Sequence, residues 1–205
     1  MGTMRMYGLF ASIDHSPIAS VITDARLADN PIVAVNRAFC DLTGYQRDEI
    51  VGRNCRFLAG PDTEPAAQAI LRQAVAQGRP ALVELTNHRK DGSAFANAVM
   101  VAPVIGEGGE LAYFLGSQMD VGAGSGLSAP RRQRAEALVR SITPRQRQVL
   151  EHMIAGYRNK QIAGFLAIDE KTVKMHRASL LNRLGVGSSA EAIRTGVEAG
   201  LAHGA

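Results

Sequence analysis

A run of small, flexible residues at positions 121–126, Val-Gly-Ala-Gly-Ser-Gly, divides the chain into two parts that follow different residue patterns. Glycine and serine at this density are typical of a linker between domains. Before the run the apolar residues alternate as in strands, and after it they recur at helical spacing. The run therefore predicts two domains of different fold class within 205 residues, a length that allows two modest hydrophobic cores.

The first part has the pattern of a mixed domain. We expect strands at 18–23, 32–35, 81–89, 93–104 and 111–120, and helical segments at 37–43, from 48, around the cysteine at 55, and at 65–77. Lys90-Asp91-Gly92 is expected to form the turn between the third and fourth strands, and Gly106–Gly109 the turn between the fourth and fifth. This order resembles the PAS fold, an α+β domain with a five-stranded antiparallel sheet and flanking helices.

The second part has the pattern of an all-α domain. Helices are expected at 130–140, 144–156, 159–166, 169–184 and 188–201. Thr143 can cap the second of these, Pro144 suits its first helical position, and Gly156 suits its C-terminal cap. The last four helices are predicted to form a four-helix domain, and the first is predicted to connect it to the linker.

Charge is distributed unevenly between the two parts. Residues 1–127 contain 10 Lys+Arg and 13 Asp+Glu, a net charge of −3, whereas residues 128–205 contain 13 and 6, a net charge of +7. A near-neutral part joined to a basic part indicates a sensor coupled to a polyanion binder. Nucleic acid is the expected polyanion.

Hydropathy and cysteine content indicate where the protein is located and which roles its cysteines can have. No apolar run has the length of a membrane helix, and the N-terminus lacks a charged region followed by a long apolar one, so we expect a cytoplasmic protein. The two cysteines, Cys40 and Cys55, form neither a disulfide framework nor a four-ligand zinc site, and no metal is expected. Cys40, beside Phe39 and Leu42, is interpreted as a small apolar residue of a helix.

The second cysteine lies in the run Gly52-Arg53-Asn54-Cys55-Arg56-Phe57-Leu58. Asn54 and Arg56 can donate hydrogen bonds to an anionic or carbonyl-rich ligand, and the two large apolar residues that follow can exclude water from it. The run resembles the signature of LOV domains, the flavin-binding blue-light sensors of the PAS superfamily. The resemblance extends over residues 15–121 and includes the segments 24–31, 36–45, 87–97 and 113–118.

The resemblance implies a role for each matching residue. Cys55 would be the photoreactive nucleophile, whose sulfur adds to carbon C4a of FMN when blue light excites the flavin. The implied cofactor-binding residues are Asn54 at the ribityl chain, Arg56 and Arg72 at the phosphate, Asn87 and Asn97 at the pyrimidine edge, and Gln118 at N5 and O4. Protonation of N5 would oblige the Gln118 amide to rotate or shift, because its oxygen and nitrogen have opposite polarity.

One position departs from the family pattern. LOV domains often have Gln after the Phe-Leu pair, and this chain has Ala59 there, which removes one polar contact to the ribityl or phosphate group. The short connection from Ala59 to Pro65 leaves little room for an adenine, so FMN is expected rather than FAD. Taken singly, Asn87 and Asn97 are more often turn or edge-strand residues than ligands, and only the ordered set of motifs favours the pocket.

The second part resembles the LuxR-type helix-turn-helix domain. The matching segments are 143–146, 159–163, 171–176 and 184–186, and Asp169 is expected to cap the recognition helix in place of the family's usual Ser. Such domains place the second helix of the pair in the major groove of double-stranded DNA. The implied DNA-binding residues are Lys171, Thr172 and Lys174 at bases, Val173 either at a thymine methyl or in the core, and Asn159, Lys160 and Arg177 at phosphates.

The last predicted helix carries an apolar stripe of Ala190, Ile193, Val197 and Leu201. Such a stripe usually packs into its own domain, but LuxR-type domains pair through this helix, so we interpret the stripe as a dimerisation surface. The same surface could dock on the sensor sheet in the dark. The expected divisions are an N-terminal extension at 1–14, a LOV sensor domain at 15–121, a linker and connecting helix at 122–141, and a LuxR-type DNA-binding domain at 142–205.

The favoured hypothesis is a non-enzymatic, blue-light-regulated transcription factor that is a monomer in the dark and a homodimer on DNA in the light. Three alternatives remain open. The first is a redox- or ligand-sensing flavin PAS regulator in which Cys55 is incidental. The second is a flavin enzyme, which the absence of a second cofactor motif and of an acid–base constellation disfavours. The third is a helical domain that binds protein rather than DNA.

Overall fold

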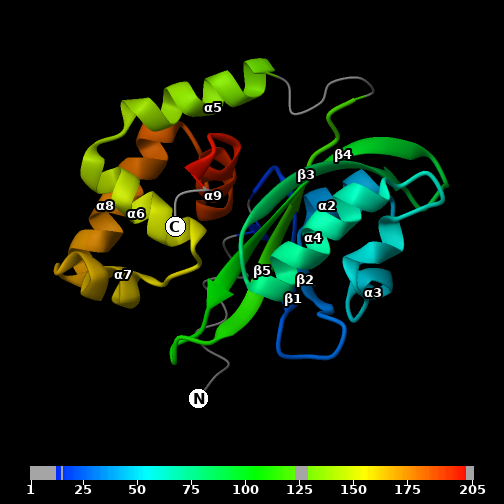
Figure 1. Cartoon of the computed structure of the whole chain (residues 1–205), viewed down its shortest axis with the longest axis horizontal. Coiled ribbons are helices and arrows are strands. Elements are labelled where there is room, and N and C mark those ends of the chain that lie inside the picture. Colours follow the sequence, from blue (N-terminus) through cyan, green and yellow to red (C-terminus); the bar gives the residue numbers. More distant parts are fainter. Residues whose placement is uncertain (1–12, 15, 123–128, 202–205) are drawn as a thin grey trace.

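The structure is a computed structural model that describes residues 13–14, 16–122 and 129–201. Most of the predicted N-terminal extension and positions 123–126 of the predicted linker lie outside the described residues. Within the described ranges a β-sheet occupies the centre, the helices that precede residue 80 cover one of its faces, and the group of helices that follows residue 128 lies against the other (Figure 1).

Five strands form one antiparallel sheet in the order β2-β1-β5-β4-β3. The strands are β1 (Ala19–Asp24), β2 (Ile32–Val35), β3 (Ala81–His88), β4 (Ala94–Ile105) and β5 (Leu111–Gln118). The helices of this part are α2 (Arg37–Thr43), α3 (Arg47–Ile50), the 3-10 helix η1 (Cys55–Leu58) and α4 (Pro65–Gln77). The α+β fold class is confirmed, and the strand ends differ from the predicted ones by at most two residues.

Local side-chain chemistry fixes the start of this domain. Asn36 caps α2 by accepting a hydrogen bond from the Phe39 amide at 3.0 Å, and its Oδ1 also accepts from the Ser20 amide of β1 at 2.9 Å. Its amide nitrogen donates to the Ile18 carbonyl at 2.8 Å. One buried amide therefore joins the first helix to the first strand, and Gly44 at φ 77° ends that helix.

The second part is all-helical, as predicted. Its helices are α5 (Ala129–Ser141), α6 (Pro144–Ile154), α7 (Asn159–Leu166), α8 (Glu170–Leu184) and α9 (Ser189–Glu198). Thr143 and Gln146 form a reciprocal capping box at the start of α6. Asp169 does occupy the N-cap position of α8, but its side chain makes no capping hydrogen bond, so the predicted capping role of Asp169 is wrong.

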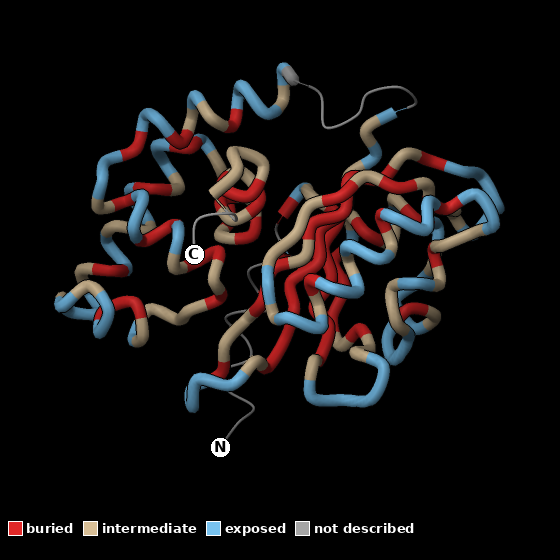
Figure 2. Tube along the Cα trace, in the orientation of Figure 1, coloured by how far each residue is buried: buried red, intermediate tan, exposed pale blue. Residues whose placement is uncertain are grey.

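Side chains alternate between the two faces of the sheet, and each face has its own core. Val21, Val99 and Phe114 point toward η1 and α4, whereas Ile22, Met100 and Leu115 point toward the helical part. The second set joins the interior of α6, α8 and α9 in one continuous apolar cluster (Figure 2). The helical part is therefore packed on the sheet through a shared core.

Candidate functional site

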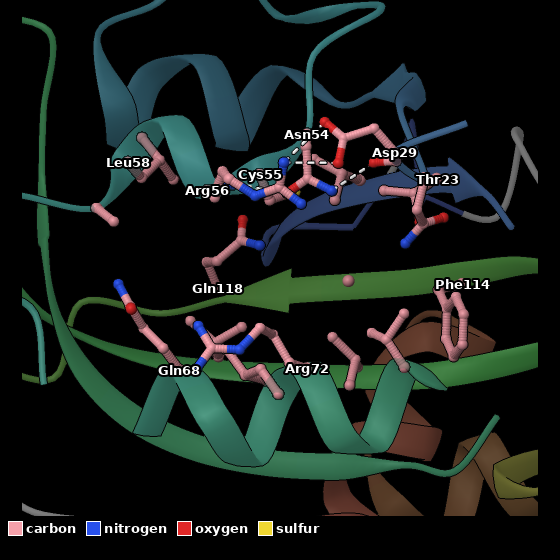
Figure 3. Close-up of a pocket in the computed structure, with 18 of the residues that line it drawn as sticks. Thr23, Asp29, Asn54, Cys55, Arg56, Leu58, Gln68, Arg72, Phe114 and Gln118 are labelled. Carbon is pink, nitrogen blue, oxygen red and sulfur yellow. Dashed lines mark hydrogen bonds and ion pairs between the residues drawn. The ribbon is translucent and has the colours of Figure 1, made fainter. Parts of the chain in front are cut away.

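A cavity of about 610 Å³ lies between the sheet, η1 and α4. Its walls carry Asn54, Cys55 and Arg56 from η1 and its cap, Arg72 from α4, and Asn87 and Gln118 from the sheet. In Figure 3 Gln118 projects from β5 between the η1 side, with Cys55 and Arg56, and the α4 side, with Gln68 and Arg72. A volume of this size, apolar with a few convergent polar groups, is typical of a cofactor site.

Cys55 is the first residue of η1, and Asn54 caps that helix by accepting from the Arg56 amide at 3.0 Å. The cap fixes the direction in which the thiol leaves the backbone, toward the cavity. Burial raises the pKa of the Cys55 thiol to about 12, and its own backbone hydrogen bond opposes this only weakly. Cys55 is therefore protonated at neutral pH. Cys40, the other cysteine, packs with Phe39 and Leu42 outside the cavity, as predicted.

A turn at residues 28–31 is fastened over η1. The Asp29 carboxylate accepts from Arg56 Nη1 at 2.6 and 2.8 Å, and the Asp29 carbonyl accepts from Asn54 Nδ2 at 2.6 Å. Asp29 and Asn30 adopt positive φ angles of 66° and 48°, a conformation that Asp and Asn tolerate better than other side chains. The predicted phosphate residue Arg56 thus lies at the rim of the cavity, held by a carboxylate.

Arg72 lies on the opposite wall, on α4. Among the described residues it has no ion-pair partner, so its guanidinium is available to an anion at the cavity mouth. The two predicted phosphate residues therefore face the same cavity from different helices. Ala59, which follows η1, also lines the cavity and presents only a methyl group there.

The two predicted pyrimidine-edge amides are joined. Asn97 Nδ2 donates to Asn87 Oδ1 at 2.8 Å, and Asn87 Nδ2 donates to the Leu58 carbonyl of η1 at 3.1 Å. Asn97 Oδ1 accepts from the Met119 amide at 3.1 Å, just beyond β5. Asn87 lines the cavity, whereas Asn97 is fully buried behind it. The pair links η1, β3, β4 and the end of β5.

Gln118 has an unsatisfied oxygen. Its side chain is 3% exposed, and Oε1 has no hydrogen-bond partner among the described residues. Thr23 Oγ1 and Asn30 Oδ1, on the same cavity wall, are also buried without partners. Because an unpaired buried polar atom is costly, three such atoms around one cavity indicate a ligand that supplies polar groups. A flavin fits this set, since its ring edge has both hydrogen-bond acceptors and a donor.

The predicted DNA-binding residues lie on α7 and α8. Lys160, Lys171 and Lys174 are exposed and Thr172 is partly exposed, so all four are accessible from solvent. Lys174 pairs with Glu170 at 3.1 Å within its own helix. Met175, which follows Lys174 in the chain, is a large apolar side chain that is also exposed.

Some of the residues predicted to contact DNA are instead engaged with other residues of the protein. Val173 is completely buried and belongs to the core, so its predicted contact with a thymine methyl is wrong and the core alternative is correct. Arg177 donates to the Asn159 side chain and to Ser189 Oγ, the latter at 2.6 Å. Arg177 and Asn159 therefore join α7, α8 and α9 to one another, and phosphate binding by either remains a prediction.

Helix α9 lies against the sheet. Its predicted dimerisation residues Ala190 and Val197 are buried, and Ile193 and Leu201 are partly buried against the same cluster. The loop after α6 also contacts the sheet, because the Gly156 carbonyl accepts from the Ile105 amide of β4 at 2.9 Å. The face predicted for dimerisation is therefore buried in the cluster that α9 shares with its neighbouring helices and the sheet.

The sequence prediction missed Arg194, which is on α9 and is 2% exposed. It donates to Ser117 Oγ of β5 at 2.9 Å and to the Ala98 carbonyl of β4 at 3.2 Å. A charged residue inside the apolar stripe, with Glu198 four residues later, was the available signal. Asp29 was also missed, and the available signal was the Asn30-Pro31 pair that follows it, which is typical of a turn.

Membrane-spanning helices and metal-binding clusters are both absent from the residues that the structure describes. None of their helices is both long and apolar enough to cross a membrane. None of their His, Cys, Asp and Glu side chains gather in threes that could hold a metal ion.

Comparisons with known proteins divide the chain in the same way. The PAS domain family model matches residues 18–123, and the model of bacterial regulatory proteins of the luxR family matches residues 140–195. Blue-light-activated histidine kinase 1 of Erythrobacter litoralis is 55% identical over 104 residues, which are 51% of this chain and 29% of the kinase. A blue-light-activated histidine kinase of Rhizobium johnstonii is 46% identical over 110 residues, 54% of this chain and 32% of that protein. The chain thus spans about a third of the length of these curated relatives.

A solved structure agrees with the sequence comparison. The light state of the blue-light photoreceptor Aureochrome1 LOV domain has a TM-score of 0.51 and 42% identity, and the match covers 57% of this chain and 88% of that one. The PAS model covers just over half of the 205 residues. The chain therefore belongs to the PAS domain family, as a LOV-type blue-light-sensing domain joined to a DNA-binding domain of the luxR family.

Proposed function

We propose that this chain is a transcription factor whose DNA binding is regulated by blue light through FMN bound in the cavity. The observation that carries the proposal is the buried, unpartnered Gln118 oxygen in the cavity that Cys55 also lines. Asn54, Asn87 and Gln118 would bind the polar edge and side chain of the flavin, and Arg56 and Arg72 its phosphate. Asn97, predicted to bind the flavin directly, lies behind the cavity and would act by holding the Asn87 amide. The flavin, when bound, absorbs blue light and offers a ring carbon to which the Cys55 sulfur can bond.

The residues of the chain supply the rest of the chemistry. Cys55 is a protonated thiol, so it would supply both the sulfur for a bond to the flavin ring carbon and the proton for the adjacent ring nitrogen. Gln118 would then face a hydrogen-bond donor in place of an acceptor. Gln118 has to present its oxygen in place of its amino group, because an amide has one donor end and one acceptor end.

The raised pKa of Cys55 bears on whether this thiol could itself sense oxidants. A redox sensor uses a thiolate, which attacks oxidants and disulfides, and such cysteines have a lowered pKa. Burial raises the pKa of Cys55 to about 12, so almost no thiolate exists at neutral pH. This supports light, rather than oxidation, as the signal that engages Cys55.

The packing of α9 on the sheet supports a proposal for the output. We infer that the docked arrangement is the dark, monomeric state, because the stripe of Ala190, Ile193, Val197 and Leu201 is buried or partly buried while α9 lies against the sheet and so is not free to pair with a second copy. A change at Gln118 would weaken docking and free the helical part to dimerise on DNA. The chain then works as a regulator and not as a catalyst.

Two measurements test this function. The FMN-loaded protein should lose its blue absorbance on illumination and regain it in the dark. Affinity for double-stranded DNA should fall steeply with salt, and Lys171→Ala should reduce the slope of log affinity against log salt by about 1 if Lys171 contacts a phosphate. A helical part that binds protein instead would give no such salt dependence.

A further inference from the structure

Arg194 is a buried charge at the boundary between α9 and the sheet. Its side chain is 2% exposed, and its guanidinium has acceptors on three sides: Ser117 Oγ at 2.9 Å, the Ala98 carbonyl at 3.2 Å and Glu198 Oε1 at 2.8 Å. Only Glu198 belongs to the helical part. Burial lowers the pKa of Arg194, and the Glu198 carboxylate opposes this. While the helical part lies on the sheet, the buried charge therefore depends on Ser117 and Ala98 for two of its partners.

The acceptors of Arg194 are directly connected to the cavity. Ser117 and Gln118 are consecutive on β5, so their side chains point to opposite faces of the sheet, Ser117 toward α9 and Gln118 into the cavity. Ala98, the other acceptor, lies next to Asn97, and its amide donates to the Met119 carbonyl at 2.9 Å. The same segment of β5 and β4 thus carries the cavity amides on one face and the Arg194 acceptors on the other.

The energetics of a buried charge differ from those of an apolar contact. A buried and fully bonded ion pair is about as stabilising as an apolar side chain of similar volume, because its desolvation offsets its attraction. Removing one acceptor, however, leaves a charge buried without its full set of partners, which is strongly destabilising. Arg194 therefore makes docking sensitive to small displacements of Ser117 and Ala98, whereas an apolar residue would tolerate them.

We propose that Arg194 is a polar latch that makes docking of α9 conditional on the position of the β5 segment at Ser117. The latch contributes little to the strength of docking when intact, and it expels α9 when Ser117 moves. This inference rests on the proposed function, since it names the contact by which a change at Gln118 reaches the DNA-binding part. The proposal assigns a regulatory role to a residue outside both the cavity and the recognition surface.

The test compares variants of the full-length chain in darkness, by DNA affinity and by hydrogen–deuterium exchange of α9. Ser117→Ala removes one acceptor and should raise dark DNA affinity about tenfold, with faster exchange in α9. Arg194→Lys keeps the charge but loses the guanidinium group that bonds to several acceptors at once. It should therefore also raise dark DNA affinity and speed exchange in α9. Arg194→Met removes the charge at similar volume and should leave dark affinity near that of the wild type.

The double variant Ser117→Ala/Arg194→Met provides the decisive comparison. If Arg194 is a latch, removing its charge should cancel the effect of Ser117→Ala, and dark affinity should return to the wild-type value. Ser20→Ala is the matched control, because Ser20 pairs with Ser117 across β1 and β5 but its hydroxyl bonds to the Ile18 carbonyl. Ser20→Ala should change neither dark DNA affinity nor hydrogen–deuterium exchange of α9.

Three results would overturn the latch. Ser117→Ala could behave like Ser20→Ala, the double variant could behave like Ser117→Ala alone, or Arg194→Met could release α9 as strongly as Arg194→Lys. All are measured in the dark, so they are separate from the proposed light response. A wild type whose DNA affinity ignores light would contradict the proposed function, whereas a light-responsive wild type with any of these three results would contradict only the latch.

Discussion

The two faces of strand β5 differ in how their polar groups are satisfied. On the cavity face, Gln118 has a buried oxygen without a partner among the described residues. On the opposite face, the Ser117 hydroxyl accepts from a buried arginine of α9. The first face is built to receive a ligand and the second is already occupied by the chain itself. Sensing and docking are thus separated by the thickness of one sheet, and the coupling requires no long pathway.

Removing the thiol should abolish the function of the cavity face altogether. We expect Cys55→Ala to bind FMN but to show no reversible loss of blue absorbance and no difference in DNA affinity between darkness and light. Cys40→Ala is the matched control, because Cys40 packs outside the cavity. It should retain both responses. A light response in Cys55→Ala would show that the two faces communicate without the thiol.

Breaking the docked face directly should give the next largest effect. Gly156 has φ 88°, and a Cβ there would clash with the Pro103 carbonyl of β4. Gly156→Ala should therefore release the helical part and raise dark DNA affinity by about 10-fold or more, as measured by titration of labelled duplex. Gly185→Ala is the control, since it has φ 68° but open space around a Cβ. Both lose about 1–2 kcal/mol of stability from the backbone, and equal DNA affinities would contradict docking through this loop.

Gln118→Leu tests whether the signal leaves the cavity through this residue, because it removes the amide while keeping most of the side-chain volume. Photochemistry at Cys55 should persist, because the thiol and the cavity shape are retained. The light-induced gain in DNA affinity should fall by several-fold, since an apolar side chain cannot exchange donor for acceptor. The check is the ratio of light to dark affinity. An unchanged ratio would show that the signal leaves the cavity by another residue.

The smallest expected effect is that of pH on the cavity face. The pKa of Cys55 is raised from 9.0 to about 12, so the thiol stays protonated throughout the neutral range. The fraction of blue absorbance lost on illumination should therefore be constant up to pH 9. The raised pKa of Cys55 also makes the stability of the fold depend on pH. The stability that this thiol contributes is fully present below pH 9.0 and is lost as the pH rises toward about 12. A photochemical yield that titrates near neutrality would show that Cys55 reacts from a less buried setting.

The cavity was largely predictable from sequence, and the docked face was not. The run around Cys55 and the ordered motifs at Asn87, Asn97 and Gln118 are local signals, and the fold brings them to one cavity apart from Asn97, which lies behind Asn87. The strand pattern was readable because turns at Gly92 and Gly109 punctuate it.

Docking depends on long-range complementarity that no local pattern contains. The apolar stripe of α9 was visible, but the same stripe can pack in its own domain, pair with a second copy or cover a sheet. Arg194 was overlooked because a single arginine on a helix is usually solvated. For the same reason Arg177 was predicted at a phosphate, although it bonds to Asn159 and Ser189.

The most direct test of the account is the DNA affinity of the FMN-loaded, full-length protein, measured on one duplex at one salt concentration in darkness and under blue light. The account predicts weak binding by a monomer in the dark, tight binding by a dimer in the light, and a return to weak binding at the rate at which blue absorbance recovers. Equal affinity in darkness and light, with normal photochemistry at Cys55, would contradict it.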